Sequence, residues 1–279
     1  MEYVIVMDSC GECTARMKED ESVISAPLTL QVDDHIIIDD DTFDQADFLR
    51  KVAESPNCPK SACPSPDHYK EAFEKAEKRA YGVTLTAELS GSYNSAMLAK
   101  DLVLEERPEL QIHIFNSRSA SVGETLITEK IQECEEKGME FSEVVETVEN
   151  YINTQNTYFV LENLETLRKN GRLSNLKAFV ASALKIKPVM GATPEGTIIQ
   201  LDQARGMNKA LVKMVDYVAG AAEDPEQKIL GITHCNCPER AEAVKNAILE
   251  KISVKDVILL DTAGVSSMYA NDGGVIVVL

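Results

Sequence analysis

Short apolar segments alternate with amphipathic segments along the first half of this chain, and this alternation is the feature that most limits its fold. Residues 3–8 (YVIVMD), 83–87 (VTLTA) and 111–115 (QIHIF) have the composition of buried strands. An alternation of strands and helices is typical of a parallel sheet with helices on both faces. The sequence therefore predicts an α/β fold, with helices in this half over residues 66–82, 91–106 and 119–138.

The second half has a different pattern. Residues 188–201 (PVMGATPEGTIIQL) are two apolar runs joined by a Pro-Glu-Gly turn, which is typical of a β-hairpin. A helical stretch over residues 162–184 precedes the hairpin, and the polar residues 153–157 (NTQNT) separate the two halves. We therefore predict two domains, residues 1–155 with the parallel sheet and residues 156–279 with a mixed or antiparallel sheet and helices.

The charge of the chain limits its partners. The 28 Lys and Arg residues against 46 Asp and Glu residues give a net charge of 28 − 46 = −18. Residues 1–150 carry 32 acids and 14 bases, whereas the remaining residues carry 14 of each, so the excess lies in the first half. A nucleic-acid partner needs a basic face to neutralise phosphates. The composition therefore argues against nucleic-acid binding.

Targeting signals and the cysteine count indicate the compartment. The chain has no run of about 18 apolar residues, and its start, MEYVIVMDSC, lacks the basic region of a signal peptide. We therefore expect no membrane span and a cytoplasmic protein. Seven cysteines, an odd number, favour reduced thiols over a disulfide framework.

Serine-rich turns stand before helices at three places in the first half: Ser61 to Ser65, Ser90-Gly91-Ser92, and Ser117 to Ser121. A helix N-terminus carries free N–H groups and a partial positive charge, which suit an anion. Turns at the carboxyl ends of parallel strands lie at the edge of the sheet where ligands bind. These turns therefore predict a site for a carboxylate or a phosphate; the alternative is that each serine only caps its own helix.

Several segments, in order, resemble the successive signatures of the DegV family. They cover the chain up to about residue 260 and begin with Asp8-Ser9 after the first strand. The others are CPSPDHYKEAFE, ELSGSYNSA, NSRSASVGE, NLETLRKNGRLS, KIKPVMG, QARGMNKAL and THCNCPERAEAV. The resemblance rests on the order and spacing of these segments rather than on any one of them.

The resemblance implies a two-domain α/β protein that binds one long-chain fatty acid without catalysing a reaction. It implies that the acyl chain is buried and that the carboxylate lies near the domain junction. It also implies presentation of that carboxylate to a separate fatty acid kinase, which forms the acyl phosphate. The resemblance implies no cofactor; the fatty acid is the bound ligand.

The resemblance assigns ligand-binding roles to particular residues. Ser90, with Gly91 and Ser92 beside it, matches the carboxylate-binding serine of the family, and Ser61 matches a family hydroxyl residue that is usually Thr. Both hydroxyls can donate to a carboxylate.

Two arginines match family arginines near the pocket mouth, where they would serve the pocket or the partner surface. These residues are Arg172 and Arg205. Arg172 has an alternative role as a cap of the helix that ends near residues 170–171. Arg205 has an alternative as an ordinary surface arginine.

The chain departs from the family pattern in two places. Ala62 and Cys63 replace the usual Ser and Gln after Ser61, and the C-terminal signature His-Thr-Gly-Pro-Gly is absent. Aligned on Gly274, the carboxylate-binding His corresponds to Ser267, which can donate one hydrogen bond but carries no charge. Tyr269 offers a phenolic donor in the same stretch.

Cysteines and histidines support a rival hypothesis, an enzyme or a metal or thiol site. Cys10 and Cys13 form a CxxC pair, and His234, Cys235 and Cys237 stand together later in the chain, with Cys58 and Cys63 between. The CxC spacing of the second group and its place in the other predicted domain argue against a shared zinc ion. The chain has no G-x-S-x-G, P-loop or G-x-G-x-x-G motif.

Overall fold

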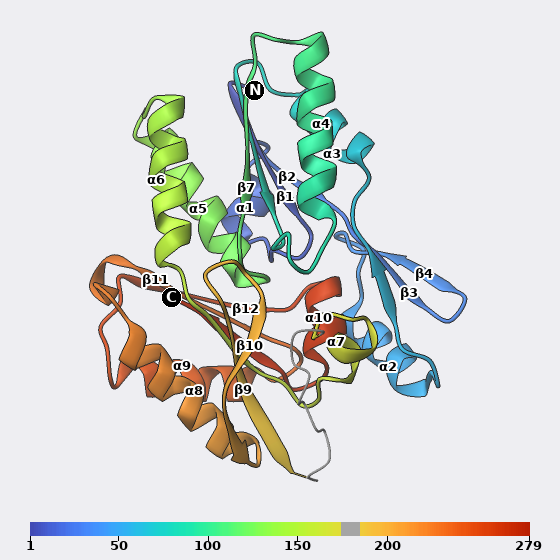
Figure 1. Cartoon of the computed structure of the whole chain (residues 1–279), viewed down its shortest axis with the longest axis vertical. Helices are drawn as coiled ribbons and strands as arrows, with labels where there is room; N and C mark the ends of the chain where they lie inside the picture. Colours follow the sequence, from blue (N-terminus) through green and yellow to red (C-terminus); the bar gives the residue numbers. More distant parts are fainter. Residues whose placement is uncertain (174–184) are drawn as a thin grey trace.

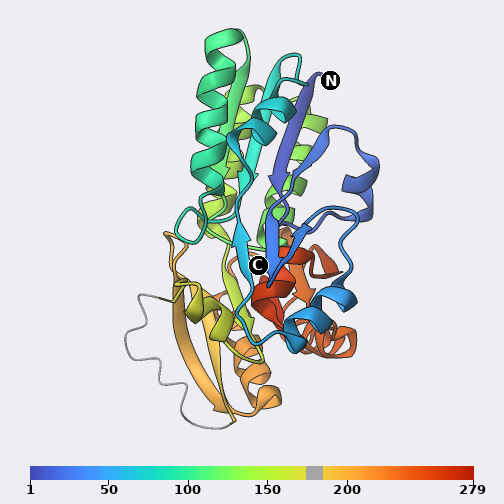
Figure 2. The ribbon, with the colours of Figure 1, turned by 90° about the vertical axis from the view of Figure 1, so that its right-hand side faces the viewer.

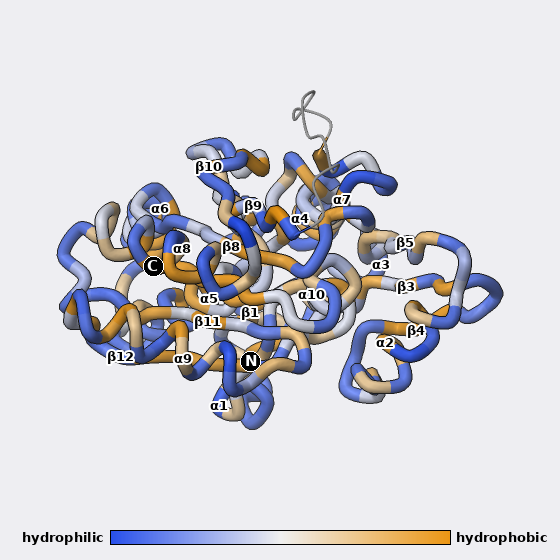
Figure 3. Tube along the Cα trace, turned by 90° about the horizontal axis from the view of Figure 1, so that it is seen from below, coloured by the Kyte–Doolittle hydropathy of each residue, from blue (hydrophilic) through white to orange (hydrophobic). Residues whose placement is uncertain are grey.

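A computed structural model of the 279-residue chain describes residues 1–173 and 185–279. It contains two main sheets stacked one above the other, with the parallel sheet in the upper part of Figure 1 and the mixed sheet in the lower part. Figure 2 shows the same division from the side. Apolar segments run through the centre of the molecule, and hydrophilic segments lie at its periphery (Figure 3).

The N-terminal sheet is fully parallel, with the strand order β2-β1-β6-β7. Its side chains alternate between two helical layers, because successive residues of a strand point to opposite faces. Val4 and Val6 pack against helices α3 and α4, whereas Ile5 and Met7 pack against α5 and α6. The elements are β1 (Tyr3–Asp8), β2 (Val23–Ala26), β6 (Arg79–Thr84), β7 (Gln111–Asn116), α1 (Ala15–Glu19), α3 (Pro66–Phe73), α4 (Ser92–Glu106), α5 (Val122–Glu136) and α6 (Phe141–Thr154).

The C-terminal sheet is mixed, with the strand order β10-β9-β8-β13-β11-β12. Only β11 and β12 pair in parallel; the other neighbours are antiparallel. Helices α8 and α9 cover one face with an apolar core that includes Met214 and Val244. The elements are β8 (Thr157–Val160), α7 (Glu165–Lys169), β9 (Ile186–Ala192), β10 (Ile198–Arg205), α8 (Met207–Ala221), a 3-10 turn η1 (Pro225–Gln227), β11 (Ile229–His234), α9 (Pro238–Leu249), β12 (Asp256–Asp261), α10 (Gly264–Ala270) and β13 (Val275–Val278).

A small antiparallel sheet forms a third unit beside the two main sheets. Its order is β4-β3-β5, from strands β3 (Thr29–Val32), β4 (His35–Ile38) and β5 (Lys60–Ala62). Helix α2 (Gln45–Glu54) connects β4 to β5 and lies against α10 of the second half (Figure 2). This unit carries Ser61 on β5 and so brings an N-terminal segment to the C-terminal half.

Helix α5 lies between the two main sheets. Ile127 and Ile131 pack against the parallel sheet, whereas Val122 and Leu126 pack against the mixed sheet. Gly231 on β11 permits this approach, since a Cβ atom there would stand 2.7 Å from Cγ2 of Val122. The start of α5 is therefore fixed by both halves of the molecule.

The structure confirms the predicted fold class, with a parallel N-terminal sheet covered on both faces and a mixed C-terminal sheet. The predicted hairpin is also present as β9 and β10, and its turn residue Gly196 has a φ of +93°. The main sheets take their strands from residues 3–116 and 157–278. The division at residues 155 and 156 remains a proposal.

The predicted helix over residues 66–82 is wrong at its end. It begins as expected, with Ser65 as N-cap and Pro66 in the first turn, but it ends at Phe73. Residues 79–84 form β6 instead, because this strand pairs with both β1 and β7 at the centre of the sheet. Of the helical stretch predicted over residues 162–184, the structure describes α7, and residues 174–184 lie outside the described part.

Candidate ligand-binding cavity

A cavity of about 340 Å³ lies between the parallel and mixed sheets. Its volume is within the range of small-molecule sites in proteins. Both halves of the chain and the small sheet contribute to its wall. The apolar part of the wall consists of Leu28, Leu85, Leu89, Phe159, Leu161, Leu167, Ile198, Val265 and Ile276.

The loops that follow β6 and β7 form one side of the cavity. Thr86 N–H donates to the carbonyl of Ser119 at 3.0 Å, which ties the two loops together. Thr86 Oγ1 donates to the carbonyl of Gly196 at 3.2 Å, which ties the first loop to the β9–β10 hairpin. A Cβ atom on Gly196 would stand 2.2 Å from Thr86 Oγ1. The two halves of the chain are therefore in direct contact beside the cavity.

Four polar residues of the wall are linked by short contacts, directly or through Leu89, and we call them the head-group end: Ser61, Ser90, Arg172 and Tyr269. Thr86, Arg118, Ser119, Ser121, Thr157 and Ser266 are the other polar residues of the wall. Ser61 Oγ and Tyr269 Oη are 3.2 Å apart. Arg172 donates from Nε to the carbonyl of Leu89 at 3.2 Å and from Nη1 to the carbonyl of Asn170 at 2.6 Å. Arg172 thus holds the carbonyl at the end of α7, as the capping alternative predicted, and also lines the cavity.

Four of the seven residues expected at the ligand lie at this cavity: Ser61, Ser90, Gly91 and Arg172. They come from β5, from the turn before α4 and from the loop after α7. The carboxyl end of β6 explains the position of Ser90 and Gly91. The serine-rich turn after β7 reaches the same cavity through Ser119 and Ser121.

The other three expected residues do not line the cavity. Ser92 is fully buried in the first turn of α4. Arg205 is exposed at the end of β10, where the alternative of a surface arginine fits and a role on a partner surface is untested. Ser267 is fully buried and lies in a polar network with Thr262 and Gln45.

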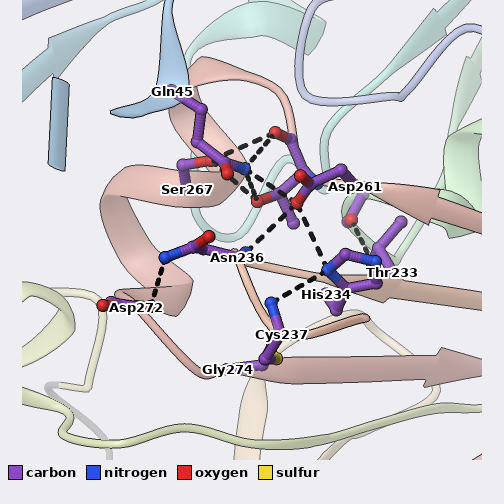
Figure 4. Close-up of polar contacts among 11 residues, drawn as sticks. Gln45, Thr233, His234, Asn236, Cys237, Asp261, Ser267, Asp272 and Gly274 are labelled. Atoms are coloured by element: carbon purple, nitrogen blue, oxygen red, sulfur yellow. Dashed lines mark hydrogen bonds and ion pairs between the residues drawn. The ribbon is translucent and has the colours of Figure 1, made fainter. Parts of the chain in front are cut away.

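Figure 4 shows this network at the ends of β11 and β12. Gln45 of α2 donates to Ser267 Oγ at 3.2 Å and to Asp261 Oδ1 at 2.9 Å. Ser267 Oγ stands 2.7 Å from Thr262 Oγ1 and donates to the Thr262 carbonyl at 3.1 Å. Ser267 therefore fastens α10 to α2 and does not replace a ligand-binding histidine.

The position of the missing histidine needs correction for a simple reason. A five-residue signature that ends at Gly274 begins at residue 270, not at Ser267. Ala270 lines the cavity. By this count Ala270, and not Ser267, takes the first position of the signature, and its neighbour Tyr269 carries a polar group to the head-group end.

A second polar group lies beneath the cavity and was not predicted as a unit. We call Asp8, Glu12, Asp39 and Glu124 the buried acid cluster; all four are less than 5% exposed. Asp8 accepts from the backbone N–H groups of Cys10 and Leu85, at 3.0 Å and 2.9 Å. The resemblance pointed to Asp8 alone. Asp39 comes from an acidic stretch of the sequence, DDHIIIDDD, but is buried.

Each acid of the cluster has a different hydrogen-bonding environment. Asp39 accepts from the backbone N–H groups of Gly264 and Val265 at 2.6 Å and 2.8 Å and from Ser9 Oγ at 2.9 Å. Burial nevertheless raises the pKa of Asp39 to about 6. Both carboxyl oxygens of Glu124 lack a partner within the described residues.

Burial dominates the acid–base properties of the two glutamates. Burial raises the pKa of Glu12 to about 8, even though Ser121 Oγ donates to it at 2.8 Å. Burial and the negative charge of Asp8 raise the pKa of Glu124 well above its usual value. Both effects disfavour the charged form of Glu124.

The cysteine and histidine clusters do not assemble as the rival hypothesis requires. In the described ranges, the only three metal-ligand atoms found within 4.8 Å of one another belong to Asp8, Cys10 and Glu124. Burial raises the pKa of Cys13, Cys235 and Cys237 to about 11 each, which keeps these thiols protonated. All seven cysteines are described and are free thiols.

His234 belongs to the network in Figure 4. Its Nδ1 lies 3.3 Å from the backbone nitrogen of Cys237 and 3.3 Å from Asp261 Oδ1, and it forms a hydrogen bond with only one of them at a time, because a ring nitrogen either accepts or donates. Partial burial raises the pKa of Asp261, but hydrogen bonds from His234 and Gln45 outweigh this effect and lower it below the usual value. The cluster is thus a structural junction of β11, β12, α2 and α10.

None of the helices in the described part of the chain combines the length and apolarity needed to cross a bilayer. A parallel and a mixed sheet joined through α5, with an apolar cavity between them, define an α/β protein with an internal site for a small amphiphile. The model of the DegV family, described as an uncharacterised protein family, matches residues 2–279. The chain belongs to the DegV family, as the sequence resemblance predicted.

Relatives agree with this assignment in sequence and in structure. A DegV domain-containing protein of Streptococcus pneumoniae is 36% identical over 253 residues, which are 91% of this chain and 89% of the relative. A DegV family protein from Ruminococcus gnavus, solved with vaccenic acid, is 56% identical with a TM-score of 0.97, and all of both chains is covered.

A third similar protein is the Fatty Acid Kinase (Fak) B3 protein of Streptococcus pneumoniae, solved loaded with linoleic acid. It is 34% identical with a TM-score of 0.89, over 100% of this chain and 99% of that chain. The fold of the present chain is therefore shared with proteins whose structures hold long-chain fatty acids.

Proposed function

We propose that this protein binds one long-chain fatty acid, buries the acyl chain in the cavity and holds the carboxylate at the head-group end. The observation that carries the proposal is the division of the cavity wall. One part is apolar, with Phe159, Leu161 and Ile198, and another carries Ser61, Ser90 and Arg172. This division matches the two parts of a fatty acid.

The apolar wall supplies the affinity in this proposal. Burial of a methylene group contributes about 0.8 kcal/mol, so a chain of about sixteen carbons gives a gross driving force on the order of 10 kcal/mol. The head group then fixes the orientation of the ligand. The 56% identical Ruminococcus gnavus protein, whose structure holds vaccenic acid, supports a ligand of similar length.

We infer a carrier rather than an enzyme. The carboxylate would be presented to a separate fatty acid kinase in the cytoplasm, and no cofactor is needed for binding. The similarity to the Fak B3 protein supports this role. Arg205, exposed at the end of β10, is the candidate for contact with the kinase.

The direct test is mass spectrometry of small molecules released from the purified, denatured protein. We expect about one fatty acid per chain. Release of a different amphiphile, or of none even after incubation with vaccenic acid, would contradict the proposal.

A metal assay on the same sample tests the rival hypothesis. A carrier predicts no stoichiometric metal, whereas a site at Asp8, Cys10 and Glu124 predicts one ion per chain that a chelator removes. A fatty acid without metal would leave the thiol and metal hypothesis without support.

A further inference from the structure

The hydroxyl groups around the cavity differ in whether their protons are already used. Thr86 Oγ1 donates to the carbonyl of Gly196 at 3.2 Å, and Ser266 Oγ donates to the carbonyl of Cys10 at 3.0 Å. Ser121 Oγ donates to Glu12 at 2.8 Å. Since a hydroxyl has only one proton to donate, these three groups have none left for a ligand.

The pair of Ser61 and Tyr269 is different. Their oxygens are 3.2 Å apart, so one of the two hydroxyls donates to the other. The second hydroxyl keeps its proton, and both side chains line the cavity. Ser90 Oγ accepts from the backbone N–H of Ser92 at 3.2 Å and also keeps its own proton. The Ser61–Tyr269 pair and Ser90 therefore each bring an unused donor to the cavity, while Arg118, which also lines it, donates from Nη1 to Asn153 Oδ1 at 2.7 Å.

We propose that Tyr269 determines the specificity of this site by donating its phenolic hydrogen bond to the ligand carboxylate, with Ser61 orienting the phenol. The inference rests on the fatty-acid function proposed above. Tyr269 then supplies the hydrogen bond to the carboxylate, next to Ala270, whose methyl group can donate none.

The electrostatic surroundings of the phenol agree with a donor role. Burial raises the pKa of Tyr269, while Ser61 and the charge of Arg172 act in the opposite direction, so the phenol stays protonated at neutral pH. Arg172 uses two of its five N–H groups on the carbonyls of Leu89 and Asn170. Its positive charge remains beside the carboxylate without depending on a titrating imidazole.

The test compares a fatty acid with its methyl ester on the variant Tyr269→Phe, which removes only the hydroxyl group. A hydrogen bond to a charged group is worth about 10-fold to 100-fold in affinity, so vaccenic acid should bind at least about 10-fold more weakly to the variant. The methyl ester, which has no carboxylate, should change by less than about 3-fold. Tyr158→Phe is the matched control, because Tyr158 is buried in the core around α8 and does not line the cavity.

The outcomes separate this inference from the proposed function. Suppose that the unmodified protein binds the acid, and that Tyr269→Phe either weakens the binding of acid and ester equally or leaves both unchanged. Tyr269 then does not bind the carboxylate, and only the inference fails. If the unmodified protein binds no fatty acid, the proposed function itself fails. A double-mutant cycle with Ser61→Ala should give a coupling between the two residues that is absent for the ester.

Discussion

The head-group end lines the cavity and the buried acid cluster lies behind its wall, and the two use their hydrogen bonds in opposite ways. At the head-group end, Ser90 and one hydroxyl of the Ser61–Tyr269 pair keep donor protons that nothing in the described residues accepts. In the acid cluster, Asp8 and Asp39 accept from several backbone N–H groups, and burial beside Asp8 raises the pKa of Glu124. The first region is organised for a ligand, and the second is organised for folding.

The strongest expected effect comes from Asp39→Asn. An amide offers one acceptor oxygen to the N–H groups of Gly264 and Val265 and places an NH₂ group beside them. We expect a loss of about 3 kcal/mol in the free energy of unfolding, because buried N–H groups lose charged acceptors. Urea denaturation measures this loss.

The exposed Asp34 provides the control for that experiment. Asp34→Asn should change the unfolding free energy by less than about 0.5 kcal/mol. A fully stable Asp39→Asn protein would show that the acid cluster does not support α10, and the contrast between the two regions would disappear.

The second effect concerns pH. The folded-state pKa values of Glu12, Asp39 and Glu124 are raised, so the folded state binds more protons than the unfolded state. Their contribution to stability is complete below about pH 4 and is lost as the pH rises toward about 8, at up to about 1.4 kcal/mol per pH unit for each group.

The variant Glu124→Gln removes one titrating group and so isolates its share of the pH dependence of stability. The amide can donate to Asp8 without needing a proton from solution, so the variant should be more stable by about 2 kcal/mol at pH 8 and nearly unchanged at pH 4.5. The measurement is urea denaturation at both pH values, with the exposed Glu146→Gln as control. An equal change at both pH values would contradict a protonated Glu124.

The contrast between the regions also shows what the sequence could predict. The alternation of strands and helices could be predicted from the sequence. The turns after β6 and β7 could also be predicted to lie together, because parallel strands bring their carboxyl ends to one edge of the sheet. The part of the cavity wall that β8 forms could not be predicted. Its residues alternate between the core around α8 and the cavity, so Phe159 lines the ligand site whereas Tyr158 does not, and only the position of the facing elements decides between them.

Short elements limited the prediction further. Helix α10 has seven residues and an N-terminus held by the side chain of Asp39, more than 200 residues away along the chain. Strand β5 has three residues and brings Ser61 to Tyr269. Neither element has enough local periodicity to be recognised, since tertiary contacts rather than propensity stabilise them.

The third effect is on ligand binding. Arg172→Gln removes the positive charge at the head-group end and should weaken vaccenic acid binding by about 10-fold at low salt, and by less at high salt. Fluorescence displacement or calorimetry at two salt concentrations would measure it. The methyl ester should be affected only slightly. Equal weakening of acid and ester would mean that Arg172 acts only through the carbonyls of Leu89 and Asn170.

The smallest expected effect is that of Arg205→Gln on ligand binding, and it tests whether the two matched arginines share one role. Arg205 is exposed and does not line the cavity, so fatty acid affinity should change by less than about 2-fold. If the proposed presentation to a kinase holds, acyl phosphate formation with a fatty acid kinase should fall while binding stays constant. A large loss of binding would place Arg205 at the site in solution. Unchanged binding together with unchanged acyl phosphate formation would reduce Arg205 to a surface residue and leave Arg172 as the only one of the two arginines with a function.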